Sequence, residues 1–349
     1  MKKRILAIAL ILAMLTISLA ACGDKDTGES AGGGGGAVIK GKNIDTEPLK
    51  IAFINLASGS VSNSMAYVVF DEYFSVYPLA QWQIFDGQFD PTVQNNLIQE
   101  CITQKYDAII CEVLDTEAVN SSIRAAEEAG IPFICFNPGA TAVYSCHIQG
   151  ADYELGWHGA KYLAEACGNK GNIILLSPPA AQVATSRMGV GARDYIDQNT
   201  DMVILDEQYI DFWSQEVAMN VMTDLLTKHD NIDAVYGCQD DIALGAVQAI
   251  KNAGREGILV WGSTGLPNGL QAIKDGDMYG TSFCNQYNEL YGAITVAMYC
   301  VQTGVNAVSA GFEDLPHIRW NIQPVTKENV DFPIAIWDHC LSYYAEKVG

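Results

Sequence analysis

Positive charge is scarce in this 349-residue sequence, in which 20 lysine and arginine residues face 41 aspartate and glutamate residues, a formal net charge of −21. Because nucleic-acid-binding proteins neutralise phosphates with basic side chains, this balance argues against such a function. Long apolar runs are also scarce, and only the N-terminus contains one that approaches spanning length, which excludes a multi-span membrane protein. The length favours two domains, because single hydrophobic cores rarely grow far beyond about 250 residues.

Histidine is the next scarce residue, with five dispersed copies. Glu154 and His158 are one helical turn apart and could share a metal ion, but no third ligand is evident. A solvated helix face is the favoured interpretation of this pair. We therefore predict no metal and no cofactor.

The ten cysteines contain no CxxC pair, and the nine that follow Cys22 are odd in number. Cys111, Cys135 and Cys238 fall in apolar runs typical of strands, where cysteine behaves as a small buried hydrophobe. A disulfide framework is the alternative for an exported chain. We expect mostly reduced, structural thiols.

The first residues have the pattern of an export signal. Lys2, Lys3 and Arg4 precede an apolar run that ends in small residues. Its last four residues, Leu19-Ala20-Ala21-Cys22, resemble the lipobox of bacterial lipoproteins. The resemblance implies that residues 1–21 are a signal peptide and that Cys22 is lipidated, which would anchor the protein to the outer face of the cell membrane. An uncleaved N-terminal anchor is the alternative.

Residues 22–47 are rich in glycine, with an unbroken run from Gly32 to Gly36. Nothing in this segment can form a core, so it is predicted to be a flexible linker. A phosphate-binding loop is the sharper alternative, but no strand precedes these glycines.

From Leu49 onward, short apolar runs alternate with amphipathic segments. Strands are expected at 51–54, 82–85, 108–113 and 131–136, and helices at 63–76, from Pro91 with Asp90 as its N-cap, and at 117–129. The pattern restarts with strands at 172–176, 202–205, 234–236, 258–261 and 279–283 and helices between them. Continuous apolar strands separated by helices predict two doubly wound lobes with parallel sheets, an α/β fold. Ligands of such sheets bind beyond the carboxyl ends of the strands.

Several segments resemble the type I periplasmic sugar-binding proteins, most of all their ribose and galactose branch. The matching segments are FDGQFDP at 85–91, KYDAII at 105–110, AAEEAGIP at 125–132, ADYELG at 151–156, IDAVY at 232–236, DDIALGA at 240–246 and VTKENV at 325–330. Sugar-responsive repressors share this fold but carry a DNA-binding headpiece where this chain has a signal and linker.

The resemblance implies two lobes joined by a three-segment hinge. Lobe 1 would combine residues 48–151 with 287–320, and lobe 2 would combine 152–286 with 321–349. It further implies a monomer that closes around a small-molecule ligand such as a sugar, glycoside or polyol. The closed form would then dock on an ABC permease that works with a separate ATPase subunit.

The resemblance also implies ligand-binding residues at positions that match the family's contacts. These are Asn63, Asn137, Asp152, Arg187, Trp213, Gln239, Thr264 and Gln286. Asn137 and Pro138 replace an Asp-Arg pair of the family, and Thr264 replaces an aspartate. A carboxylate accepts charge-assisted hydrogen bonds from vicinal hydroxyls, so these changes suit a modified sugar, a glycoside, a polyol or another small polar ring better than a free pentose.

Each of these residues has a structural alternative. Asn63, Asn137 and Asp152 are also good N-caps for the helices that follow them. Trp213 could fasten a helix to its lobe, and Arg187 could pair with an acid such as Asp194.

An enzyme is not predicted. Gly262-Ser263-Thr264-Gly265 lacks the spacing of a nucleophile elbow, and Gly189-Val190-Gly191 lacks the third glycine of a dinucleotide site. A ligand-sensing lipoprotein that signals to a membrane receptor or kinase without transport is the remaining alternative.

Overall fold

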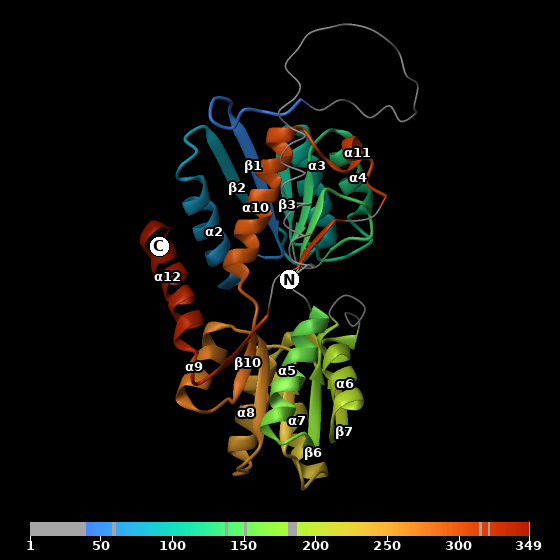
Figure 1. Ribbon diagram of the computed structural model, residues 1–349, viewed down its shortest axis with the longest axis vertical. Helices are drawn as coiled ribbons and strands as arrows, with labels where there is room; N and C mark the ends of the chain where they lie inside the picture. Colours follow the sequence, from blue (N-terminus) through green and yellow to red (C-terminus); the bar gives the residue numbers. More distant parts are fainter. Residues whose placement is uncertain are drawn as a thin grey trace, which may run out of the picture. The chain divides into compact units, whose positions relative to one another are not determined.

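The computed structural model describes residues 40–57, 61–136, 139–149, 152–180, 187–313, 316–319 and 322–348. These residues all belong to one compact unit, Gly36–Gly349. They form two six-stranded sheets, each flanked by helices (Figure 1). The expected α/β fold with two doubly wound lobes is confirmed.

The first sheet has the strand order β11-β5-β4-β3-β1-β2, and all of its pairs are parallel. Its strands are β1 (Leu49–Asn55), β2 (Ala80–Asp86), β3 (Ala108–Cys111), β4 (Phe133–Phe136), β5 (Cys146–Gln149) and β11 (His317–Arg319). Its helices are α2 (Val61–Phe74), α3 (Pro91–Thr103), α4 (Asn120–Glu128), α10 (Gln286–Thr303) and α11 (Ala307–Ala310). Asp90 caps α3 by accepting from the backbone nitrogen of Thr92 at 2.7 Å, as predicted.

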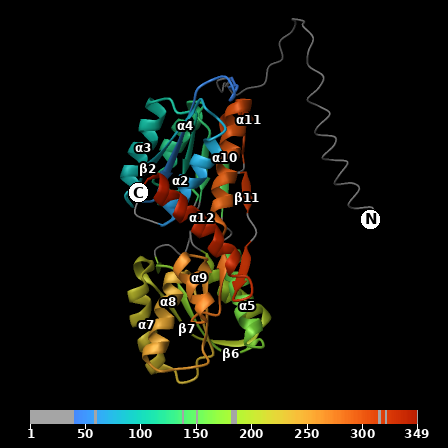
Figure 2. The same cartoon turned by 90° about the vertical axis from the view of Figure 1, so that its left-hand side faces the viewer.

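Helices cover both faces of this sheet (Figure 2). The alternation of buried side chains along β1 explains why. Ile51 and Phe53 pack in the same cluster as the apolar side chains of α2, whereas Ala52 and Ile54 pack with those of α3 and α4. A strand that is buried on both sides needs the continuous apolar sequence seen here.

The second sheet has the order β12-β10-β9-β8-β6-β7. Its strands are β6 (Lys170–Ser177), β7 (Asp201–Tyr209), β8 (Ala234–Gly237), β9 (Leu259–Thr264), β10 (Gly280–Phe283) and β12 (Gln323–Thr326). The helices next to these strands in the chain are α5 (Asp152–Ala166), α6 (Met188–Asn199), the short η2 (Asp211–Trp213), α7 (Gln215–Lys228), α8 (Asp240–Asn252), α9 (Pro267–Asp275) and α12 (Asp331–Lys347).

One strand departs from the parallel arrangement predicted from the sequence. β12 pairs with β10 in the antiparallel sense, with Gly280 opposite Thr326. Helices α10 and α11 and strand β11 lie between β10 and β12 in the chain. An antiparallel edge strand on a parallel sheet is a common arrangement.

The chain passes between the two sheets three times. β5 of the first sheet leads to α5, which packs on the second sheet. β10 returns the chain to α10 on the first sheet, and β11 leads to β12. The strands next to the crossovers lie at one side of each sheet, β5 and β11 in the first sheet and β10 and β12 in the second. Strands β2 and β7 form the opposite edges.

Close helix packing in the second lobe depends on glycine. At Gly156 in α5, the backbone of Met188 and Ala192 in α6 occupies the space that a Cβ would need. Gly191 in α6 lies equally close to the backbone of Tyr153 and Trp157. The two helices therefore approach each other at positions where neither carries a side chain.

The nine cysteines of the described residues are free thiols, and all but Cys167 are buried. Cys111 and Cys135 are register partners on β3 and β4 and pack in one apolar cluster. Burial raises the pKa of the Cys135 thiol to about 12. Such a thiol stays protonated at neutral pH and is a poor nucleophile.

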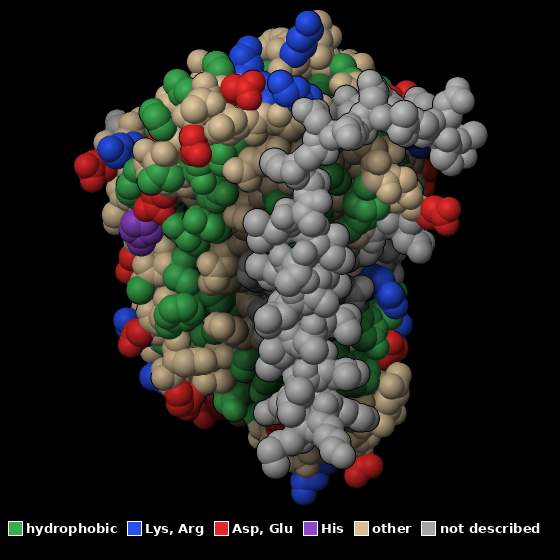
Figure 3. All heavy atoms as spheres, turned by 45° about the horizontal axis from the view of Figure 1, so that its top comes forward, with side chains coloured by type: hydrophobic (Ala, Val, Ile, Leu, Met, Phe, Trp, Pro, Cys, Tyr) green, Lys and Arg blue, Asp and Glu red, His purple; other side chains and the backbone are tan. Residues whose placement is uncertain are grey.

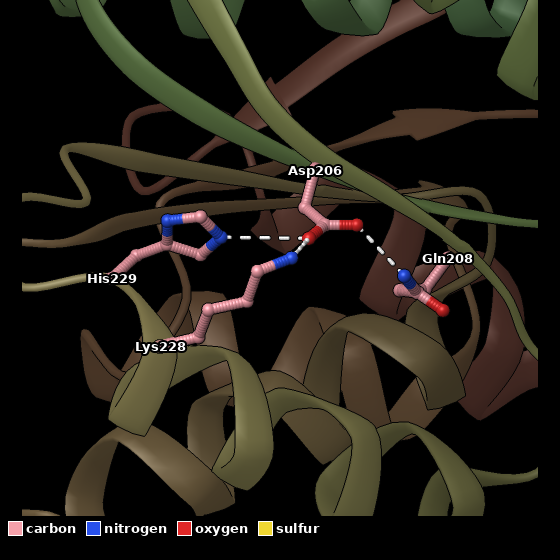
Figure 4. Close-up of polar contacts among 4 residues, drawn as sticks. All are labelled: Asp206, Gln208, Lys228 and His229. Atoms are coloured by element: carbon pink, nitrogen blue, oxygen red, sulfur yellow. Dashed lines mark hydrogen bonds and ion pairs between the residues drawn. The ribbon is translucent and has the colours of Figure 1, made fainter.

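A cluster of polar side chains around Asp206 links the edge strand β7 to the end of α7 (Figure 4). The Asp206 carboxylate accepts from Lys228 Nζ at 2.6 Å and from Gln208 Nε2 at 2.7 Å, and His229 Nε2 lies 3.4 Å from it. Burial raises the pKa of Asp206, but these hydrogen bonds outweigh it and leave the pKa below its ordinary value. The cluster ties the end of α7 to the sheet and places charges on an edge that would otherwise be open to pairing.

On the face shown in Figure 3, acidic and basic side chains are interspersed among polar and apolar ones. In the described part of the chain, no helix combines the length and the apolar character that crossing a membrane requires.

Candidate functional site

Polar side chains gather at the carboxyl edge of the first sheet, where a doubly wound fold binds its ligands. Asn55 ends β1, and its Nδ2 donates to Asn63 Oδ1 at 2.6 Å. The backbone nitrogen of Gly87 donates to Asn55 Oδ1 at 3.3 Å. Asn63 is thereby fixed beside the ends of β1 and β2, where it lines a cavity of about 340 Å³ with Asp86 and Trp82.

Two other cavities lie at the opposite ends of the strands. One of about 410 Å³ is lined by Lys105 and Asp107 before β3. The other, of about 510 Å³, is lined by Lys170 at the start of β6 and Asp233 before β8. Because ligands of this fold bind at the carboxyl edge, neither cavity is assigned to the site.

A buried amide holds the ends of β1 and β3 together. Gln94 Nε2 donates to the Glu112 carbonyl at 2.7 Å and to the Asn55 carbonyl at 3.3 Å, while its Oε1 accepts from the Leu114 nitrogen at 3.0 Å. Each bond satisfies a backbone group that the end of a strand leaves unpaired. Gln94 therefore keeps this edge of the sheet in a fixed geometry.

Three carboxylates from three elements interact at the carboxyl edges. Glu112 follows β3, Asp152 begins α5 and Glu289 lies in the first turn of α10. Burial and the Glu289 charge raise the pKa of Glu112 to about 7, against a hydrogen bond from the Leu56 nitrogen. Burial, followed by the charges of Glu289 and Glu154, raises the pKa of Asp152 to about 7. Near neutral pH the carboxyl groups of Glu112 and Asp152 can therefore both donate and accept hydrogen bonds.

Cys284, directly after β10, belongs to the same group. Its buried Sγ donates to Glu289 Oε1 at 2.8 Å. The sequence interpretation missed Glu112, Cys284 and Glu289. Glu112 and Cys284 each directly follow a strand. That position was the signal that could have found them.

At the edge of the second sheet, Gln239 follows β8 and is partly buried. Its Oε1 is enclosed and has no hydrogen-bond partner among the described residues. An enclosed amide oxygen without a partner costs free energy that a donor from a ligand would recover.

Next to it, the fully buried Asp240 organises the loop after β9. It accepts from Thr281 Oγ1 at 2.6 Å and from the Leu266 nitrogen at 2.5 Å. Burial raises the pKa of Asp240 to about 7. Thr264 adopts φ +91° and points its hydroxyl at Asp240 Oδ2, 3.4 Å away. This hydroxyl is therefore turned toward Asp240.

The loop after β7 carries two adjacent aromatic residues in the left-handed region, Phe212 at φ +59° and Trp213 at φ +54°. Such backbone is strained for residues with a bulky side chain. Trp213, named from the sequence, packs partly against the core, whereas the Phe212 ring is 89% exposed. Phe212 was missed because the sequence does not reveal which of the two rings the loop turns outward.

The remaining sequence-predicted residues are dispersed. Arg187 is exposed at the start of α6, with its guanidinium carbon 5.2 Å from the centre of the Tyr153 ring. Gln286 is partly buried at the first position of α10, in the same helical turn as Glu289. Asn137 and Cys22 lie outside the described residues.

The chain is similar to several known proteins. The profile of the family described as "Periplasmic binding protein domain" matches residues 52–304. A xylitol-binding protein of Mycolicibacterium smegmatis is 30% identical over 248 residues, which is 70% of this chain and 68% of that protein. A ribose import binding protein of Salmonella typhimurium is 30% identical over 200 residues, or 57% of this chain and 67% of that protein.

Solved structures show the same architecture. A solute-binding protein of Actinobacillus succinogenes with bound D-allose superposes with a TM-score of 0.72 at 25% identity, covering 81% of this chain and 99% of that one. The family consists of substrate-binding proteins of ABC transporters, which are not enzymes. With the two doubly wound sheets and the matched profile, the chain belongs to the periplasmic binding proteins, in the type I branch of the ribose- and galactose-binding proteins.

Proposed function

We propose that this protein binds a sugar, or a sugar-related polyol or glycoside, between its two lobes and delivers it to an ABC importer by hinge closure. The observation that carries the proposal is the set of amide and carboxyl groups at the carboxyl edges of both sheets. Hinge closure around a ligand is the established behaviour of periplasmic binding proteins. The printed names of its relatives, a xylitol-binding protein and a ribose import binding protein, and a solved structure with bound D-allose support a ligand of this chemical class.

Individual side chains have separate roles in this proposal. Asn63 offers its amide nitrogen as a donor, because Asn55 occupies its oxygen. Gln239 Oε1 accepts from a ligand hydroxyl, and Asp152 bonds a second hydroxyl at the crossover into α5. Phe212 and Trp213 supply an apolar ring surface against which a sugar face stacks. Arg187, Thr264, Gln286 and Asn137 complete the proposed contacts.

In this proposal the protein is a monomer, anchored to the outer face of the cell membrane through lipidated Cys22 and a linker over residues 22–47. Its lobes comprise 48–151 with 287–320 and 152–286 with 321–349. A permease with a separate ATPase subunit is the proposed partner. The ligand drives closure only through its higher affinity for the closed form.

A thermal-shift screen of the purified protein against monosaccharides, disaccharides, polyols and nucleosides tests the proposal. A ligand that binds only the native state at a hundred times its Kd adds about 2.7 kcal/mol to the free energy of unfolding. We expect a melting point raised by several degrees for a sugar or polyol. A panel in which only nucleosides raise it, or none does, contradicts the proposal.

A further inference from the structure

The C-terminal helix α12 (Asp331–Lys347) lies beyond the region matched by the family profile, which ends at residue 304. It follows β12 of the second sheet but lies beside both α9 and α2 (Figures 1 and 2). A single helix therefore contacts elements that belong to different sheets.

Two contacts fix α12 to the second lobe. Trp337 is 3% exposed, and its Nε1 donates to the carbonyl oxygen of Gly265 at 2.9 Å. Gly265 directly follows Thr264, a proposed ligand contact. Lys274 of α9 forms an ion pair with Asp331 at 3.0 Å.

A second set of contacts fixes α12 to α2 of the first lobe. Tyr343 donates its hydroxyl to Asp71 Oδ2 at 2.8 Å, and His339 Nε2 lies 2.8 Å from Glu72 Oε1. The Tyr344 and Tyr67 rings meet edge to face with their centres 5.4 Å apart.

Glu72 links these contacts to a crossover. Its other oxygen, Oε2, accepts from the hydroxyl of Tyr287 at 2.5 Å. Tyr287 is the second residue of α10, directly after the segment in which the chain returns to the first sheet. One carboxylate thus joins α2, α10 and α12 beside the hinge.

We propose that α12 is a strap that limits how far the two lobes open when no ligand is bound. The proposal rests on the proposed function, because hinge closure around a ligand gives the strap its effect. Opening that separates α2 from the second lobe has to break the contacts of His339 and Tyr343. Limiting that opening raises the population of molecules that are competent to close, and apparent affinity rises with that population.

The test compares the full-length double variant His339→Ala/Tyr343→Phe with wild type. Asp331→Asn is the matched control, because it removes a polar contact of the same helix that stays within the second lobe. Small-angle X-ray scattering of the ligand-free proteins gives the radius of gyration. We expect a larger radius for the double variant and a wild-type radius for the control.

Ligand affinity supplies the second readout. The double variant should bind the ligand identified by the screen about three to ten times more weakly, the effect of one or two hydrogen bonds. An unchanged radius of gyration, or an unchanged or higher affinity, overturns the strap. Scattering needs no ligand, so the strap and the proposed function fail separately. If the double variant does not unfold cooperatively, Tyr343→Phe alone, which removes one hydroxyl, takes its place.

Discussion

Replacing Phe212 by alanine separates a ligand contact from a structural role. The Phe212 ring is 89% exposed, so it contributes little to the folded state. Alanine also carries a Cβ, so the left-handed backbone at φ +59° is no easier to adopt in the variant. We therefore expect the free energy of unfolding to change by less than about 0.5 kcal/mol.

Ligand binding should respond much more strongly. Burying an exposed phenylalanine ring contributes about 1.5 to 3 kcal/mol, and stacking adds about 0.5 to 1.5 kcal/mol. Because a ligand covers only one face of the ring, we expect Phe212→Ala to cost about 1 to 2 kcal/mol, a loss of roughly five- to thirtyfold in affinity.

Isothermal titration calorimetry with the ligand from the screen measures this loss. Phe89→Ala is the matched control, because Phe89 is also exposed, at 61%, and left-handed, at φ +50°, in the loop after the edge strand β2. We expect the control to bind as wild type does. Wild-type affinity in Phe212→Ala, or an equal loss in both variants, would refute the stacking role.

Three further predictions concern stability and anchoring. The pKa of Glu112 is about 7 in the folded protein, above its ordinary value. Between about pH 4.5 and 7 the folded state therefore binds more protons than the unfolded state, and the free energy of unfolding falls as the pH rises. Glu112→Gln should reduce this slope in urea unfolding by up to about 1.4 kcal/mol per pH unit, and an unchanged slope would contradict the assignment. Gly156→Ala should lower the free energy of unfolding by about 1 to 3 kcal/mol in the same assay, because the backbone of α6 leaves no room for a Cβ. Wild-type stability of this variant would show that α5 and α6 can move apart without cost. Cys22→Ser should release the protein from the cell envelope in a fractionation experiment, and retention of the variant would count against lipidation.

The fold was largely predictable because its signals are local. Continuous apolar runs identified most of the buried strands, though not β5, and Asp90 with Pro91 marked the start of α3. The antiparallel β12 was not predicted, since the direction of a short edge strand depends on where the connection from β11 arrives. The contacts of α12 with two lobes were equally invisible, because they join residues far apart in the chain.

The site was less predictable, because side-chain orientation depends on tertiary packing. The position after a strand pointed to Gln239, and the structure leaves its enclosed oxygen without a partner among the described residues. The same rule named Thr264, but the left-handed backbone turns its hydroxyl toward Asp240. Glu289 escaped notice because it lies within α10 and only the folded chain places its side chain against Cys284.

Titration calorimetry of the wild-type protein with the sugar or polyol from the screen, followed by recovery of the ligand, tests the central claim most directly. The account predicts one saturable site per chain and chemically unchanged ligand after release. A ligand that returns altered, or a titration with no saturable heat from any sugar or polyol, would contradict it.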